Sequence, residues 1–266
     1  MTWLALRVAR SALRQPATRH RYGEHPHQVA DLHHPRGPGP YPVVVVLHGG
    51  YWQRPYTKLV MRPLCVDLVR RGYAALNVEY RRLGRDGGGW PQTFDDVATA
   101  IDHLADPALG DAGLDLGRVT LLGHSAGGQL ALWAAGRAEL PADAPGAGPR
   151  VLASRVLAMA AVCDLQSAGR PARALLGGTP SEVPERWAQA DPMRRIPLSV
   201  PVGLVHARGD ETVSVQVSRD YAAAAQAAGA DVTLAEPPGG HRAPIDPGST
   251  AWNVAAHWLS AREPGA

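Results

Sequence analysis

Apolar residues recur along the chain in two patterns, short continuous runs and longer segments with a spacing of three to four. Residues 43–47 form an unbroken run of four valines and a leucine, which is typical of a strand with both faces covered in a parallel sheet. Shorter runs bounded by Gly, Pro or polar residues predict further strands. These lie at 74–80, 119–123, 156–162, 202–206 and 232–236.

Segments with helical spacing lie between the predicted strands. They cover residues 58–71, 94–104, 129–139, 215–228 and 251–261. Strands that alternate with helices predict a doubly wound, mostly parallel sheet with right-handed crossovers. Residues 165–198 interrupt this alternation with a mixture of Arg, Pro and Gly. We interpret them as a cap insertion over the site or, equally well, as a surface excursion.

Composition limits the class of protein. The 266 residues are 45% hydrophobic and 19% charged, which excludes disordered, collagen-like and coiled-coil chains. Since α/β domains often reach about 250 residues, we expect a single domain over residues 1–266. No stretch approaches the ~18 consecutive apolar residues of a membrane-spanning helix. Arg7, Arg10 and Arg14 interrupt the apolar N-terminal segment, so we expect no secretory signal and a cytoplasmic location.

Charge and cysteine content argue against two classes of partner. The net charge is +3, Lys58 is the only lysine, and the arginines are scattered rather than gathered in a stripe, so nucleic-acid binding is not expected. Cys65 and Cys163 have no paired spacing, and no HExxH motif occurs, which disfavours a zinc site. We expect both cysteines to be buried as small apolar residues.

The motif with the most chemical content is Gly-His-Ser-Ala-Gly at residues 123–127. It directly follows a predicted strand and opens a predicted helix, the context in which G-x-S-x-G forms a nucleophile elbow. We therefore predict that Ser125 is a nucleophile exposed at the carboxyl edge of the sheet. The alternative is a glycine-rich helix N-terminus that binds phosphate, but neither a dinucleotide-type glycine pattern nor a lysine-bearing phosphate loop is present.

A serine nucleophile requires a histidine base, and that base requires an orienting acid. Asp210 and His241 each follow a predicted strand, in the chain order Ser, Asp, His that this motif favours. Glu211 is a rival acid beside Asp210. Ten other histidines compete with His241 for the role of base. The nearest contenders, for which we expect simpler backbone or strand-end roles, are His48, His124 and His206.

The negative charge that develops on a carbonyl oxygen needs hydrogen-bond donors. The sequence His-Gly-Gly-Tyr-Trp at residues 48–52 follows the strand at 43–47. A glycine-rich loop there can direct the backbone N–H groups of Gly49 and Gly50 to the same space as that of Ala126. We predict that these three residues form an oxyanion hole, the alternative being a simple turn that ends the strand.

Together, the segments at 48–52, 123–128, 209–213 and 240–241 resemble the α/β-hydrolase superfamily along nearly the whole chain. The HGGYW loop is similar to the HGGxW loop of kynurenine formamidase and related esterases, and residues 22–26 and 31–35 look like that family's amino-terminal strand. The resemblance implies an α/β-hydrolase fold of about eight strands, with a small cap or excursion after the sixth. It implies Ser125, Asp210 and His241 as the catalytic triad.

The function implied is hydrolysis of a small ester or amide through an acyl-enzyme, with a formamide such as N-formylkynurenine favoured. We expect no metal and no organic cofactor, and a small molecule as the only partner identified; the oligomeric state stays open. The chain has one phenylalanine, and Arg242 follows His241 where relatives often carry an aromatic. An aromatic substrate would therefore depend on Tyr51, Trp52 and Trp187, and Trp52 could instead be a core residue that pins the loop.

Three alternatives remain at this stage. A general short-chain carboxylesterase would share the same core, as would a peptidase similar to prolyl oligopeptidase, although 266 residues leave no room for a propeller domain. A non-catalytic module that binds a small ligand would be expected to lack a triad residue. Because a base must be neutral and free histidine titrates near about pH 6.5, hydrolysis should decline on acidification.

Overall fold

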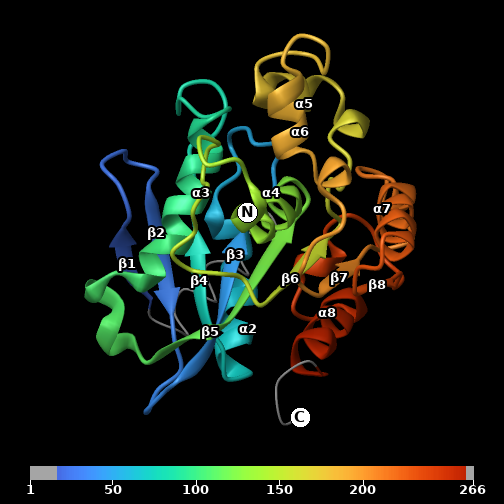
Figure 1. Ribbon diagram of the computed structural model, residues 1–266. Helices are drawn as coiled ribbons and strands as arrows, with labels where there is room; N and C mark the ends of the chain where they lie inside the picture. The colour runs from blue at the N-terminus through green and yellow to red at the C-terminus, as the bar shows by residue number, and fades with distance from the viewer. Residues whose placement is uncertain (1–16, 262–266) are drawn as a thin grey trace.

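The computed structural model describes residues 17–261, which contain one 8-stranded sheet with the order β1-β2-β4-β3-β5-β6-β7-β8 (Figure 1). Strands β1 and β2 are antiparallel to their neighbours, and the other strands are parallel. The predicted α/β-hydrolase fold class is thereby confirmed. The strands are β1 (Thr18–Arg21), β2 (Val29–His33), β3 (Tyr41–Leu47), β4 (Ala74–Val78), β5 (Leu114–His124), β6 (Arg155–Met159), β7 (Val202–Val205) and β8 (Val232–Ala235).

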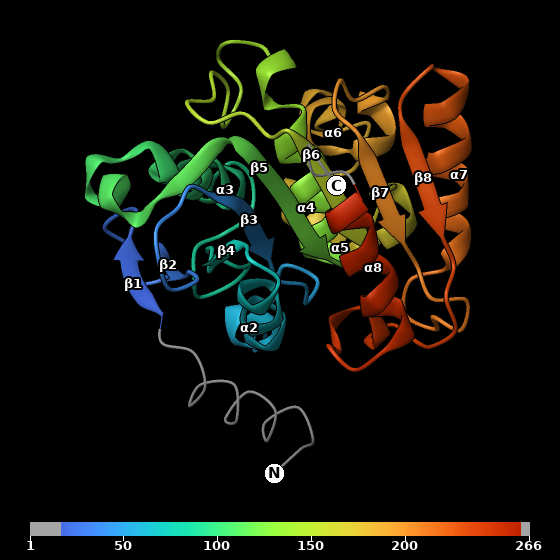
Figure 2. The ribbon, with the colours of Figure 1, turned by 90° about the horizontal axis from the view of Figure 1, so that it is seen from below.

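Helices cover both faces of the sheet, as the alternation predicted. Helices α2 and α8 lie on one side, which Figure 2 shows from below, and α3, α4 and α7 contribute to the apolar layer on the other side. The helices are α2 (Arg62–Arg70), α3 (Gln92–Asp102), α4 (Ala126–Ala135), α5 (Arg170–Leu176), α6 (Pro184–Ala190), α7 (Val215–Ala227) and α8 (Thr250–Ala261). A short 3₁₀ turn, Lys58–Met61, precedes α2.

Strand β3 shows why an unbroken valine run suits the centre of this sheet. Successive side chains of a strand point to opposite faces. Val43, Val45 and Leu47 accordingly join the core under α3 and α4, whereas Val44 and Val46 join the core under α2 and α8. All of residues 43–47 are fully buried, so no position in the run is available for a polar side chain.

The hydrophobic pattern did not find the two antiparallel strands at the edge. Strand β2 is buried at all of its positions, yet it contains Asp31 and His33. Asp31 is tolerated there because it forms ion pairs with Lys58 and with Arg19. The predicted strand 156–162 is also shorter, since Ala160 has a φ of 45° and ends the extended backbone after Met159.

Residues 165–198 fold into α5, α6 and short 3₁₀ turns, at the top of the molecule in Figure 1. Leu175 and Trp187 are buried and belong to the main core, so this insertion is anchored to the body of the domain. Its role as a cap stays a prediction. Residues 1–14, on which the expected lack of a secretory signal depends, lie outside the described residues. Among residues 17–261, no helix is both long and apolar enough to cross a membrane.

His33 leads to a prediction about acid stability. Its side chain is fully buried, and neither ring nitrogen has a hydrogen-bond partner within residues 17–261. Burial, and then the charge of Arg62, lower the pKa of His33 to about 4. The neutral ring therefore contributes stability that is present above the unfolded-state pKa of about 6.5 and is lost as the pH falls toward 4.

We predict that His33→Leu reduces the pH dependence of folding. Between pH 7.5 and pH 5, the wild-type protein should lose about 2 kcal/mol of unfolding free energy through this residue, and the variant should not. Urea denaturation at the two pH values measures the difference. An equal loss in both proteins would show that His33 does not carry this dependence.

Candidate active site

The turn around Ser125 is a strained connection between β5 and α4. Ser125 has φ 56° and ψ −120°, a left-handed conformation that costs a non-glycine residue free energy. The flanking glycines make the turn possible. A Cβ at Gly123 would lie 2.0 Å from the Gly127 carbonyl oxygen, and a Cβ at Gly127 would lie 2.3 Å from the Leu47 carbonyl oxygen. Any larger residue would therefore push the elbow away from β3.

Asp210 and His241 lie after β7 and β8 and are in direct contact. The Nδ1 of His241 donates to Asp210 Oδ2 at 2.7 Å. The other carboxylate oxygen accepts the backbone N–H groups of Thr212 at 2.8 Å and Val213 at 2.9 Å. It is thus Asp210, and not the exposed Glu211, that holds His241. The bond to Nδ1 leaves Nε2 of His241 as the nitrogen available to another group.

The environment of Asp210 keeps it ionised. Its side chain is fully buried, which on its own raises a carboxyl pKa. The hydrogen bonds from His206 and His241, with those from the Val213 and Thr212 amides, outweigh burial and hold the Asp210 pKa well below its usual range. A permanently charged acceptor therefore faces the His241 ring at neutral pH.

A cavity of about 150 Å³ brings the predicted residues together. Ser125, His241, Gly49, Gly50 and Tyr51 line it. Within residues 17–261, Ser125 Oγ forms no hydrogen bond with His241; a hydroxyl rotates freely, and such contacts often tighten only when substrate binds. Ser125 and His241 thus line one cavity without a hydrogen bond between them.

Three backbone N–H groups near this cavity have no acceptor among the described residues. Within the described residues, the amides of Gly49, Gly50 and Ala126 donate no hydrogen bond to another residue. The loop lies close to the elbow, since a Cβ on Gly49 would come within 2.9 Å of Ser125 Cβ. Stabilisation of an oxyanion requires hydrogen-bond donors that are free and that are held next to the nucleophile.

Comparison with known proteins identifies a family for this chain. The family model BD-FAE matches residues 30–224. The chain belongs to the BD-FAE family. It matches none of the curated proteins with which its sequence was compared.

Solved structures similar to this BD-FAE chain show the same fold. A truncated carbohydrate esterase from gut microbiota has a TM-score of 0.79 at 18% identity, over 92% of this chain and 94% of that chain. The butyrate-bound esterase Est2 of Thermogutta terrifontis has a TM-score of 0.74 at 21% identity, over 92% of both chains. A bifunctional GH43-CE protein of Bacteroides eggerthii has a TM-score of 0.76 at 21% identity, over 92% of this chain and 38% of that one.

The aromatic residues of the BD-FAE chain require one correction. Tyr51 lines the cavity as predicted for a substrate contact. Trp52 does not: it is fully buried, and its indole N–H donates to Gln129 Oε1 at 3.1 Å. The Gln129 amide in turn donates to the Ala190 carbonyl at 2.9 Å. Trp52 is therefore a core residue that pins the loop to α4, the alternative that the sequence had left open.

The other histidines have distinct roles. His124 Nε2 donates to the His241 carbonyl at 2.8 Å, and burial, followed by the charge of His241, lowers the His124 pKa to about 3. His206, which sequence reasoning treated as a strand end, is a second partner of the acid: its Nε2 lies 3.1 Å from Asp210 Oδ2. The spacing of four residues between His206 and Asp210 was the available signal.

We predict that Gly127→Ala destabilises the fold by about 3 kcal/mol, the upper end of the usual cost of overpacking. The added methyl would press on the Leu47 carbonyl, which β3 cannot move. Gly110→Ala is the control, because a Cβ there would meet nothing within 4 Å, and we expect a change below about 1 kcal/mol. Urea unfolding compares the two, and similar stabilities would contradict the proposed backbone contact.

Proposed function

We propose that this chain is a serine hydrolase that cleaves small carboxylic esters with a short acyl group. One observation carries the proposal: a cavity places Ser125 beside His241, which is held by Asp210, next to free N–H groups of Gly49 and Gly50. Membership in the BD-FAE family and the likeness to esterase structures support the same reaction class.

The geometry defines the proposed steps. Nε2 of His241 takes the Ser125 proton as Oγ attacks the substrate carbonyl carbon, and the amides of Gly49, Gly50 and Ala126 bind the resulting oxyanion. The imidazolium gives its proton to the leaving alcohol as the ester C–O bond breaks. Water, deprotonated by the same ring, then attacks the acyl-enzyme, and the ring returns this proton to Ser125 Oγ as the bond to the acyl group breaks and the carboxylic acid leaves. Asp210 stabilises the imidazolium in both half-reactions.

The cavity limits the substrate. Its volume of about 150 Å³ is well below the 300–1,000 Å³ of pockets that enclose drug-sized ligands. Tyr51, Val60 and Ile245 give it apolar walls. A short acyl group fits these walls, whereas the leaving group must extend toward solvent.

A formamide is the second candidate, because the HGGYW loop resembles that of kynurenine formamidase and a formyl group is the smallest acyl group. Turnover of N-formylkynurenine and of p-nitrophenyl acetate separates the two. We favour the ester; a kcat/KM at least about ten times higher on N-formylkynurenine, a difference of 1.4 kcal/mol, would reverse that preference.

We predict that Ser125→Ala abolishes hydrolysis of p-nitrophenyl acetate, by about 10⁴-fold or more, and leaves the circular dichroism spectrum and melting temperature nearly unchanged. A fluorophosphonate probe should label the wild-type protein and not the variant. If the folded variant kept its turnover, the mechanism would be wrong. If Ser125 failed to react with the probe in the wild type, a non-catalytic binding module would be favoured.

We also predict that substitutions of the adjacent acids Asp210 and Glu211 have very different effects on kcat. Asp210→Asn should lower kcat by about 10³-fold to 10⁴-fold, since an amide cannot stabilise the imidazolium or fix its tautomer. Glu211→Gln is the matched control, because Glu211 is exposed and does not hold His241, and it should keep kcat within about threefold. Steady-state kinetics on p-nitrophenyl acetate measure both, and equal losses would contradict the assignment of the acid.

A further inference from the structure

The loop that carries Gly49 and Gly50 is held in an unfavourable backbone conformation. Residues 48–58, here called the 48–58 loop, connect β3 to the turn before α2. Gly50 has a φ of 121°, and two large residues, Tyr51 and Trp52, have φ values of 52° and 55°. Left-handed backbone at such residues costs on the order of 1–3 kcal/mol each and persists only when its surroundings hold it.

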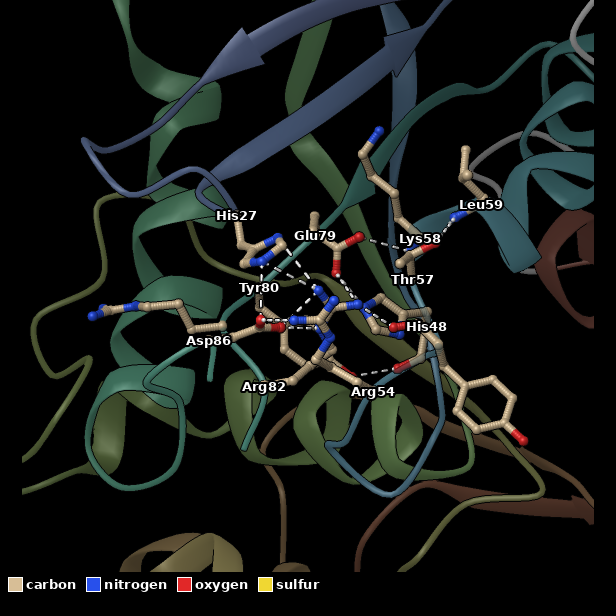
Figure 3. A network of polar contacts seen from close by, with 12 residues as sticks. His27, His48, Arg54, Thr57, Lys58, Leu59, Glu79, Tyr80, Arg82 and Asp86 are labelled. Atoms are coloured by element: carbon tan, nitrogen blue, oxygen red, sulfur yellow. Dashed lines mark hydrogen bonds and ion pairs between the residues drawn. The ribbon is translucent and has the colours of Figure 1, made fainter. Parts of the chain in front are cut away.

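Glu79, at the end of β4, joins the two ends of this loop. One carboxylate oxygen lies 3.0 Å from Nε2 of His48, at the start of the loop. The other accepts the backbone N–H of Lys58 at 3.1 Å, at its end. The Glu79 side chain is only 6% exposed, so water does not compete strongly for either contact. Figure 3 shows the carboxylate between the two loop ends.

His48 links Glu79 to the peptide between Gly49 and Gly50. Its Nδ1 donates to the Gly49 carbonyl oxygen at 2.8 Å. The C=O of Gly49 and the N–H of Gly50 belong to one planar trans peptide and point in opposite directions. A fixed Gly49 carbonyl therefore fixes the direction of the Gly50 N–H. The ring is itself stacked on Tyr80, with centroids 4.3 Å apart and planes 6° from parallel.

Arg82 holds the middle of the loop from the same segment. Its guanidinium donates to the Tyr56 carbonyl, lies 3.6 Å from Glu79 and pairs with Asp86 at 2.7 Å. The next residue, Leu83, donates its backbone N–H to the Trp52 carbonyl at 2.8 Å. Residues 79–83 thus contact the 48–58 loop at its start, middle and end.

The charges in this cluster support the contacts. Burial raises the pKa of Glu79, but the hydrogen bond and charge of His48 and the charge of Arg82 outweigh it, so the pKa lies below its usual value. Glu79 is therefore ionised at neutral pH. Hydrogen bonds to an ionised acceptor are stronger than neutral ones, which suits a residue that must hold strained backbone.

We propose that Glu79 is a positioning residue that orients the Gly50 N–H toward the cavity by tying His48 to Lys58, with Arg82 supporting the middle of the loop. This proposal rests on the proposed hydrolase function, because it assigns the loop to the oxyanion. Glu79 lies behind the loop and acts on the reacting atoms only through His48 and the Gly49–Gly50 peptide.

The test compares Glu79→Gln with Asp96→Asn on p-nitrophenyl acetate. An amide has one acceptor oxygen and no charge, so Glu79→Gln loses the charge-assisted contact of the carboxylate with His48 and can replace it only by an NH2 group that donates to an unprotonated Nε2. We expect kcat to fall by about 10-fold to 100-fold, at or below the loss of one oxyanion donor, with KM within about threefold. Asp96 is also a fully buried carboxylate, but its hydrogen bonds and ion pairs within the described residues go to Gln28 and to the side chain and backbone N–H of Arg81, not to the 48–58 loop. Asp96→Asn should lower the melting temperature and keep kcat within about threefold.

A double-mutant cycle provides a second variant in case Glu79→Gln folds poorly. His48→Asn keeps a donor near the Gly49 carbonyl and loses the contact with Glu79. If the two residues act through one contact, the double variant should lose little more kcat than either single variant. Losses that multiply would overturn the proposal, as would a folded Glu79→Gln protein with wild-type kcat.

Hydrogen exchange of the loop amides decides the question independently of activity. We expect amides at 49–53 to exchange faster in Glu79→Gln than in the wild type, and unchanged in Asp96→Asn. Unchanged exchange in Glu79→Gln would overturn the positioning role even if no ester were hydrolysed. Absence of both hydrolysis and fluorophosphonate labelling in the wild type would instead reject the proposed function, so the two failures are distinguishable.

Discussion

The site depends on a backbone-to-backbone contact between the turn at Ser125 and the end of β3. Gly127 fits against the Leu47 carbonyl with no space for a side chain, and Gly49, two residues after Leu47, also passes close to Ser125. One strand end thus fixes both the elbow and the loop of free amides. Because main chain deforms far less than side chains do, the distance between the two is set by the sheet itself. Apolar burial of β3 on both faces makes this support rigid.

Several charged side chains are buried at the β2–β4 side of the sheet. Asp31, Lys58, Glu79, Arg82 and Asp86 are all buried, and each has a partner of opposite charge. Buried pairs contribute little net stability, since desolvation offsets most of their attraction. What these pairs do provide is a fixed orientation of the side chains, because charge-assisted hydrogen bonds are directional. The cluster lies behind the 48–58 loop, where the orientation of the backbone matters more than stability.

The fold could be predicted where the chain repeats a simple pattern. The valine run of β3 and the alternation of strands and helices were sufficient for the parallel part of the sheet. The hydrophobic pattern did not predict strand β2, because its buried Asp31 pairs with Lys58, 27 positions away in the sequence. No local pattern contains that information. The residues around the cavity were accessible from the elbow motif and the order of acid and histidine. Glu79 was not, because its role follows from contacts between distant segments. For Trp52 the sequence left open whether it contacts substrate or pins the loop, and for His206 it offered only the spacing of four residues from Asp210.

Asp210 is held at both oxygens, by two backbone amides on one side and by the rings of His206 and His241 on the other. Its carboxylate plane cannot turn without breaking several of these contacts at once. The contact with Asp210 therefore fixes the position of Nδ1 of His241. If the ring rotates between the Ser125 hydroxyl and another oxygen atom in the cavity, it rotates about the nitrogen that Asp210 holds. The position of that nitrogen depends also on His206, which contacts Asp210 but does not line the cavity.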